Sequence, residues 1–200
     1  YDDTNYFFDV RAEAFPEALD RFAQFFIAPL FTETYVDRER NAVHSEYESK
    51  RLDDGRRIYV AKKEAMNPDH NWTQFSVGNL DTLENSPDNP IRPDLIDFYN
   101  RYYSANLMTL VVSAPLPLEE LETLVIQRFN DVKNRDAKPF RDAVPLFTEY
   151  ETGREIRVKT LKESRQLTLT FPLPPREAHW REKPLYFIAN QIGYEGKGSL

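Results

Sequence analysis

Apolar residues recur at helical spacing in the first part of the chain. Phe15-Pro16-Glu17 is typical of a helix start, because proline takes the first helical position and an acid lies in the first turn. The apolar positions that follow have a period of 3.6 residues and are Leu19, Phe22, Ala23, Phe26 and Leu30. This pattern predicts an amphipathic helix, and we expect its broad aromatic face to pack on a sheet.

The next segment is polar and uninterrupted. From Tyr35 to about Asp54 the chain has no proline or glycine, and Gly55 then favours a helix end. Thr34 is the expected N-cap. This is the longest helix that the sequence predicts. A second helical run from about Arg56 ends before Asn67-Pro68.

Several later segments alternate between strand-like and helical patterns. Helices are predicted over Pro93–Tyr103, Pro117–Asn130 and Pro184–Ile192, and strands over Asn5–Val10, Leu107–Ser113, Glu155–Leu161 and Gln166–Phe171. Helices and strands joined by short connections predict an α+β or α/β fold, with helices packed on a sheet.

The composition changes at residues 131–153, which are rich in charged residues, proline and glycine, as interdomain linkers are. We expect one domain over residues 1–136, a linker over 137–153, and the start of a second domain over 154–200.

Composition narrows the possible functions. Of the 200 residues 40% are hydrophobic and 14% aromatic, which allows a core and excludes wholesale disorder. The 26 Lys and Arg against 33 Asp and Glu give a formal charge of -7, so we expect neither nucleic acid nor a membrane surface as partner. Without cysteine, any metal must be held by His, Asp or Glu.

Glu39 and Glu46 are the carboxylates with the most informative spacing. Seven residues fall about 20° short of two helical turns and span about 10 Å along the axis. Both side chains therefore leave the predicted helix on the same side. Two possibilities stay open: a site that holds a cation, or the solvated surface of a chain that is 30% charged.

The three histidines do not form a metal-binding motif. His44 and Glu48 stand at i and i+4 and could share a metal, although a solvent-facing pair fits the same spacing. His70 lies in a predicted loop and His179 in a proline-rich turn. Neither shows the two-histidine spacing on one helix that zinc hydrolases use.

The run Asp37-Arg38-Glu39-Arg40-Asn41-Ala42-Val43-His44-Ser45-Glu46 closely resembles the glutamate-bearing helix of the insulinase, or pitrilysin, metallopeptidases. Further segments resemble that family in its own order, and they cover residues 4–130 and 155–200. They are Thr4–Val10, Ala18–Phe26, Gly78–Glu84, Tyr102–Met108 and the glycine cluster Gly193–Leu200.

The resemblance implies a zinc-dependent endopeptidase that acts on peptide substrates. In that family Zn²⁺ is held by two His of an inverted His-x-x-Glu-His helix and by a Glu of a later helix, and the motif's own Glu is the general base. Glu46 takes the place of the third zinc ligand, and Glu39 that of an acidic residue that supports the site. The implied fold is α+β, with helices on a mixed, mostly antiparallel sheet, in a zinc-bearing domain followed by a similar one.

No His-x-x-Glu-His occurs in these 200 residues. The resemblance therefore implies that both histidines and the general base lie upstream of Tyr1, and that the chain is a piece of a longer protein. We expect the isolated piece to be inactive. By resemblance, a periplasmic or secreted location is expected, with a cytoplasmic one as the alternative.

The sequence is also compatible with two kinds of non-catalytic protein. One is a structural or regulatory subunit of the same fold, against which the retention of both Glu39 and Glu46 argues. The second is an unrelated binding module with a solvated acidic helix. The sequence does not indicate which oligomeric state the protein has.

Overall fold

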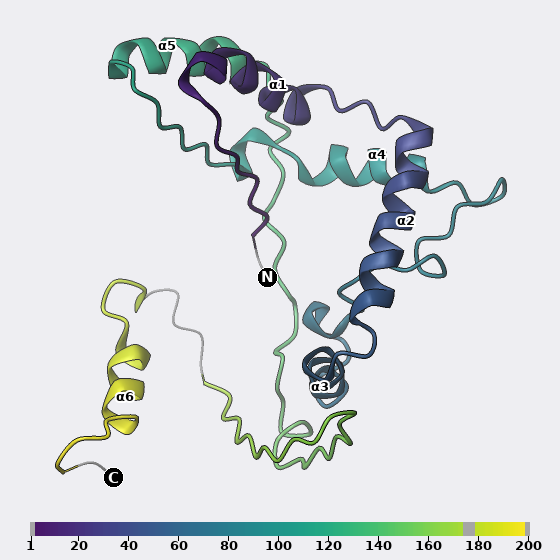
Figure 1. Ribbon diagram of the computed structural model, residues 1–200, viewed down its shortest axis with the longest axis vertical. Helices are drawn as coiled ribbons and strands as arrows, with labels where there is room; N and C mark the ends of the chain where they lie inside the picture. The colour runs from purple at the N-terminus through teal and green to yellow at the C-terminus, as the bar shows by residue number, and fades with distance from the viewer. Residues whose placement is uncertain (1–2, 174–178, 199–200) are drawn as a thin grey trace. The chain divides into compact units, whose positions relative to one another are not determined.

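The computed structural model describes residues 3–173 and 179–198, and the chain divides into two compact units, Tyr1–Lys162 and Glu163–Leu200. Figure 1 shows the helices of both units. The first unit contains, in order, η1 (Ala12–Ala14), α1 (Phe15–Ile27), α2 (Glu33–Lys50), α3 (Asp54–Lys63), η2 (Asn71–Thr73), α4 (Ile91–Tyr102), η3 (Ala105–Leu107) and α5 (Leu118–Phe129).

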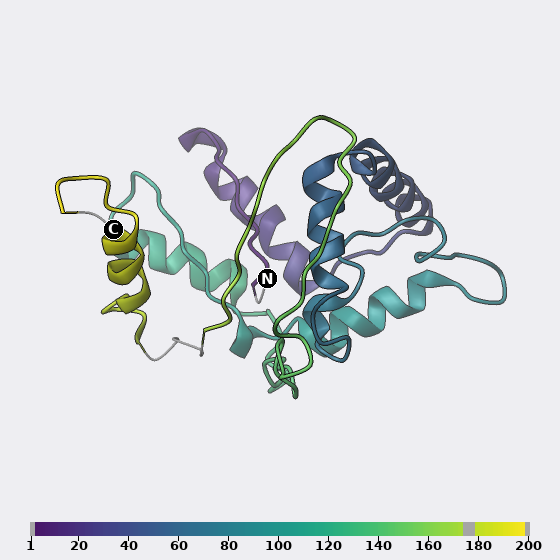
Figure 2. The same cartoon turned by 90° about the horizontal axis from the view of Figure 1, so that it is seen from below.

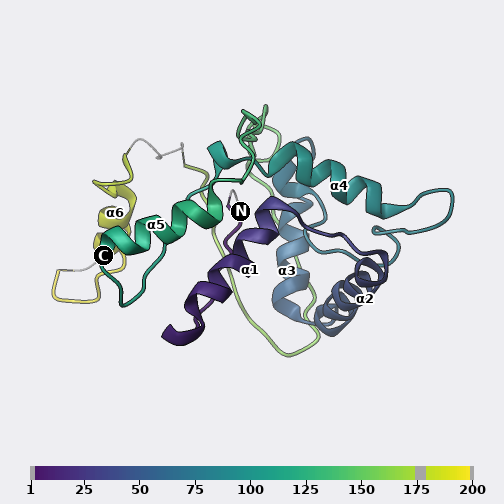
Figure 3. The same cartoon turned by 90° about the horizontal axis from the view of Figure 1, so that it is seen from above.

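The helix α1 forms with the predicted start but ends at Ile27, so Leu30 lies beyond it and is 81% exposed. Its start carries Pro16, and its inner face buries Phe15, Leu19 and Ala23. Figures 1 and 3 show α1 and α5 side by side. Between them the rings of Phe22 and Phe129 lie 6.3 Å apart in an edge-to-face arrangement. Apolar burial of this kind is the main favourable contribution to folding.

The helix α4 is fixed where α1 ends. Buried Tyr99 donates a hydrogen bond from Oη to the carbonyl oxygen of Phe26, at 2.5 Å, and its ring lies 5.8 Å from that of Phe31. Arg92 Nε donates to the carbonyl oxygen of Phe31 at 2.6 Å. These contacts satisfy backbone carbonyls at and beyond the last turn of α1, which the helix itself leaves without partners.

The predicted α+β fold is wrong for the part of the chain that the structure describes, which contains helices and neither a strand nor a sheet. The four segments predicted as strands all lie within the described residues, and they form no backbone hydrogen bonds with one another. A strand requires a neighbour that pairs with its N–H and C=O groups, and alternation alone does not supply one. The exposed fractions of Val111, Leu167 and Phe171 are accordingly 86%, 85% and 75%.

The aromatic face of α1 consequently does not lie on a sheet. It contacts α5 and the extended segment before the helix, where the ring of Phe8 lies 5.0 Å from that of Phe22 and the ring of Tyr6 lies 5.6 Å from that of Phe26.

Both helices predicted between Thr34 and Asn67 form, with shifted bounds. The first, α2, begins at Glu33 after Thr32, so Thr34 lies inside it, and it ends at Lys50. The second, α3, begins at Asp54, because the carboxylate of Asp53 accepts a hydrogen bond from the backbone N–H of Arg56 at 2.9 Å and caps the helix. Gly55 therefore lies near the start of a helix and does not end one.

Hydrogen bonds also connect the start of α3 to residues 159–162, at the end of the first unit. The carboxylate of Asp54 accepts hydrogen bonds from the backbone N–H groups of Leu161 and Lys162, at 2.8 and 3.0 Å. These bonds, which stabilise the charged form, lower the pKa of Asp54. Arg57 pairs with Asp54 at 2.8 Å and donates to the carbonyl oxygen of Lys159 at 3.2 Å.

The second unit contains α6 (Pro184–Ile192), drawn in yellow in Figure 2. Proline takes its first position after Lys183, whose backbone is left-handed with φ 47°. No helix in the described part of the chain combines the length and apolar character needed to cross a bilayer.

Candidate functional site

The helix α2 carries both carboxylates that the sequence singles out. Of its residues only Val36 is buried, in contrast to the three of α1. The charges at its ends agree with the helix dipole, with Glu33 in the first turn and Lys50 in the last. The helix is therefore a largely solvated rod that is contacted along one side.

The contacted side of α2 faces the loop of residues 75–85. Arg40 Nε donates to the carbonyl oxygen of Leu83 at 2.6 Å, while its Nη1 lies 3.1 Å from Asp37 Oδ1. The same carboxylate oxygen accepts from Asn85 Nδ2 at 2.8 Å. The bonds from Asn85 and, to a smaller extent, Arg40 lower the pKa of Asp37.

Two apolar contacts also join this side of α2 to the loop of residues 75–85. The ring of Tyr47 lies 5.8 Å from that of Phe75 in an edge-to-face arrangement. Gly78 lies so close to the helix that an added Cβ would be 2.8 Å from Val43 Cγ1. The same Cβ would meet Leu83 Cδ1 of the loop even more closely, so a larger residue at position 78 would force Leu83 and Val43 to shift.

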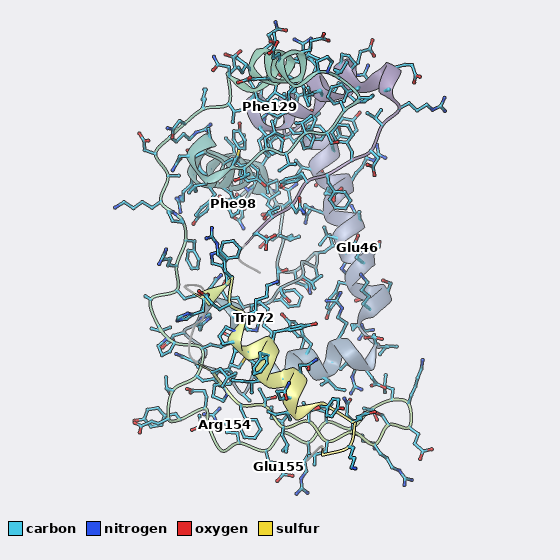
Figure 4. The ribbon with its side chains drawn as sticks, turned by 90° about the vertical axis from the view of Figure 1, so that its left-hand side faces the viewer. Glu46, Trp72, Phe98, Phe129, Arg154 and Glu155 are labelled. Atoms are coloured by element: carbon cyan, nitrogen blue, oxygen red, sulfur yellow. The ribbon has the colours of Figure 1, made fainter. Side chains whose placement is uncertain are left out.

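Glu39 and Glu46 lie on α2 beside this contacted side, and both are exposed. Figure 4 labels Glu46 on the helix. The residues that contact the loop are Arg40, Val43 and Tyr47. They are three or four positions apart, so they lie on one side of the helix. At 100° per residue the two glutamates lie about 100° to 120° around the axis from Arg40 but only about 40° to 60° from Val43, so they flank the contacted side. Neither carboxylate forms a hydrogen bond or ion pair with any residue that the structure describes.

Of the other two candidate ligands on α2, Glu48 already has a partner, whereas the buried Nδ1 of His44 has no hydrogen-bond partner among the described residues. Glu48 Oε2 lies 3.1 Å from Arg51 Nε, so the carboxylate of the His44/Glu48 pair is engaged elsewhere. His44 is half-buried, and its ring stacks on that of Tyr47 with centroids 6.4 Å apart.

The other two histidines lie outside α2. His70 accepts a hydrogen bond at Nδ1 from the backbone N–H of Trp72, at 3.1 Å, and its Nε2 lies 3.4 Å from Asp142 Oδ2. Both ring nitrogens of His70 therefore have partners. His179 is exposed in the second unit, where its carbonyl oxygen accepts from the backbone N–H of Lys183.

The carboxylate of Glu46 could be one ligand of a zinc site, but α2 alone does not supply a complete set of ligands. A carboxylate oxygen is a normal zinc ligand, and that of Glu46 is accessible. Over residues 3–173 and 179–198, however, no three His, Cys, Asp or Glu side chains gather closely enough to hold a metal ion. Glu46 would therefore need ligands from other residues.

Arg40 and Gly78 are the residues near this site that sequence patterns do not identify. The i, i+3 spacing of Asp37 and Arg40 indicates an ion pair on a helix, which is common on protein surfaces. Nothing in that spacing indicates the bond from Arg40 to Leu83.

Comparison with known families decides the identity of the chain. Residues 1–69 match the family model described as insulinase (peptidase family M16), and residues 90–200 match the peptidase M16 inactive domain. This chain belongs to the insulinase family. The resemblance inferred from the sequence is confirmed.

Relatives within the insulinase family include proteins that are named proteases. The insulin-degrading enzymes of Homo sapiens and Drosophila melanogaster are 38% and 37% identical to this chain, each over 98% of it. The A-factor-processing enzyme of Saccharomyces cerevisiae is 36% identical over 98% of the chain. A putative zinc protease of Schizosaccharomyces pombe is also 36% identical over 98%.

The chain spans 20% of the length of each of these relatives. Among solved structures, that of pitrilysin matches with a TM-score of 0.67 and 40% identity, over 71% of this chain and 15% of that one. Insulinase-family membership therefore rests on agreement in both sequence and structure.

Proposed function

We propose that this chain is part of a zinc-dependent endopeptidase in which Glu46 is a zinc ligand and Glu39 supports the site. In this proposal residues 1–136 belong to the zinc-bearing domain, 137–153 form a linker, and 154–200 begin a second domain. The two histidine ligands and the general base come from outside the 200 residues. Relatives named for degrading insulin and processing A-factor support peptides as the substrate class.

The observation that carries the proposal is the arrangement of α2. One side is held against the loop of residues 75–85, and the exposed carboxylate of Glu46 lies beside that side without a partner in the described part of the chain. A carboxylate that is already paired with a nearby donor would be less available to a metal ion. An accessible one on a fixed helix is free to bind a cation.

The chemical roles follow from charge and position. A bound zinc ion would supply a Lewis acid for hydrolysis of the peptide bond. Glu46 would contribute a negatively charged oxygen to the ligand set. Glu39, about 10 Å along the axis, lies too far away for the same role and would add negative charge at the edge of the site.

Glu46→Gln in the complete protein tests the proposal. The amide is a poorer zinc donor and carries no charge, so we expect zinc affinity to fall by more than the ~10- to 100-fold cost of losing an outer hydrogen-bond partner. Competition with a fluorescent chelator measures the affinity, and an internally quenched peptide with mass spectrometry of its products measures internal cleavage. Zinc affinity and rate at wild-type values would exclude the peptidase role and favour a non-catalytic subunit.

Glu33→Gln is the matched control, because it makes the same change at an exposed position of the same helix, about 140° around the axis from Glu46. We expect it to leave zinc affinity and cleavage unchanged. A loss equal to that of Glu46→Gln would mean that general acidity of α2, and not one ligand, is responsible.

Glu39→Gln should have a smaller effect. If Glu39 supports the site without binding the metal, removing its charge should reduce zinc affinity or cleavage rate by roughly 10- to 100-fold. The same titration and assay measure it. A loss as large as that of Glu46→Gln would assign Glu39 to the ligand set instead.

A further inference from the structure

The loop that contacts α2 is itself held in one conformation. Asn79 N donates to Thr82 Oγ1 at 3.0 Å, and Thr82 N donates to Asn79 Oδ1 at 2.8 Å. The backbone N–H of Leu83 also bonds to the carbonyl oxygen of Asn79 at 2.9 Å. The carbonyl oxygen of Leu83 is therefore presented to α2 by a closed, internally bonded turn.

Arg40 joins α2 to that turn. Its side chain is only 15% exposed, and its Nε and Nη1 are directed to Leu83 and to Asp37. Asn85 links the cluster to α4, because its Nδ2 donates to Asp37 while its Oδ1 accepts from the backbone N–H of Ile91 at 3.2 Å. Three directional hydrogen bonds thus connect α2, the loop and the first residue of α4.

Such bonds restrain rotation of the helix about its own axis. Side chains of a helix end about 5–6 Å from the axis, so a 20° rotation would move the Glu46 carboxylate by about 2 Å. Metal-ligand distances tolerate only about 0.2 Å, and a site must be held within about 0.5 Å of its working geometry. The helix α2 buries only Val36, and the apolar contacts of Val43 and Tyr47 with the loop add to this restraint, while the hydrogen bonds supply its dependence on angle.

We propose that Arg40, acting with Asp37 and Asn85, is a positioning residue that fixes the rotation of α2 and thereby the direction of Glu46. The inference rests on the proposed zinc-ligand role of Glu46 and adds to it a residue that contacts neither metal nor substrate. Arg40 acts through the helix.

Arg40→Met in the complete protein tests this, because methionine keeps an unbranched stem and removes every donor. We expect zinc affinity to fall by about 10-fold, the lower end of the range for outer partners, and kcat to fall with KM unchanged. Arg40→Lys retains one charged donor and should restore part of the loss. Arg38→Met is the matched control, since Arg38 lies over the Tyr35 ring of α2 itself, at 5.6 Å, and does not contact the loop.

A double-mutant cycle separates positioning from general stability. If Arg40 acts through Glu46, Arg40→Met causes no further loss of zinc affinity in the Glu46→Gln background, whereas a purely structural effect adds to it. If Arg40→Met does not fold, Asp37→Asn can replace it in the cycle, because it removes the charge that Arg40 and Asn85 bind and weakens both hydrogen bonds. Zinc affinity equal to that of Arg38→Met, or additive losses in the cycle, would overturn the inference.

The two proposals fail in different ways. If Glu46→Gln retains wild-type zinc affinity, the proposed function is wrong and the positioning role falls with it. If Glu46→Gln loses zinc while Arg40→Met does not, only the positioning role is wrong.

Discussion

The helices α1 and α2 are neighbours in the sequence and are held in opposite ways. α1 buries Phe15, Leu19 and Ala23 and lies against α5 and a group of aromatic rings. α2 buries only Val36 and is attached to its loop mainly through the polar side chains of Arg40 and Asp37.

This difference shows how a helix can be fixed without being covered. Apolar contact is non-directional and strengthens with the area removed from water, so it serves a helix whose inner face is buried. Hydrogen bonds depend on distance and angle, so a few of them can fix one rotation of a helix that keeps most of its surface in water. The second arrangement leaves Glu39 and Glu46 accessible.

The comparison predicts the largest effect for truncation in α1. Leu19 is 3% exposed, and Leu19→Ala should lower the free energy of unfolding by about 2–5 kcal/mol through lost burial and a cavity. Urea denaturation followed by circular dichroism measures the change. Leu30→Ala is the control, because Leu30 is 81% exposed and its truncation should cost little. Equal costs for both substitutions would contradict a buried core on this side of α1.

An intermediate effect is expected where the loop meets α2. Gly78→Ala places a methyl group against Val43 and Leu83, and such overpacking costs about 1–3 kcal/mol. Adding Val43→Ala removes the Cγ1 atom of α2 that the new methyl would contact and leaves its contact with Leu83 in the loop. The double variant should therefore be more stable than the sum of the single effects predicts, as urea denaturation can measure. Strict additivity would show that the loop does not approach α2 this closely.

The sequence predicts helices better than strands, for a physical reason. The period of Leu19, Phe22 and Ala23 is a local property, and a helix forms its backbone hydrogen bonds within the same segment. An alternating segment such as Gln166–Phe171 needs a neighbouring strand, and local pattern does not determine whether one is present. The predicted sheet is therefore wrong for the described residues, while the prediction of α1 is confirmed in type and start.

The sequence predicts only those features of the candidate site that depend on local helix geometry. Helix geometry alone places Glu39 and Glu46 on one side of α2, and the structure agrees on their exposure. The bond from Arg40 to Leu83 joins residues 43 positions apart in the sequence, so no local spacing indicates it. Asn85 joins the cluster by the same kind of long-range approach, which only the folded loop creates.

The smallest predicted effect is a titration within this polar cluster. The hydrogen bond from Asn85, followed by that from Arg40, lowers the pKa of Asp37 below its ordinary value of 3.8. Carboxyl-detected NMR should therefore give a midpoint below 3.8, and Asn85→Ala should raise it toward that value. A wild-type midpoint at or above 3.8 would show that the Asn85 and Arg40 bonds do not form in solution.

The sign of the stability effect follows from the lowered pKa. Asp37 favours the folded cluster fully above its unfolded pKa, and this contribution is lost as the pH falls through the lower folded value. The loop of residues 75–85 should then separate from α2 in acid, and amide exchange at Leu83 should quicken. The contact of α1 with α5 combines the rings of Phe22 and Phe129 with one ion pair, Arg128 Nε to Asp20 Oδ1 at 3.1 Å, and its apolar part should keep its exchange protection over the same range. Loss of both contacts at one pH would mean that acid unfolds the whole unit, and that the polar attachment of α2 is not separable from the apolar packing of α1.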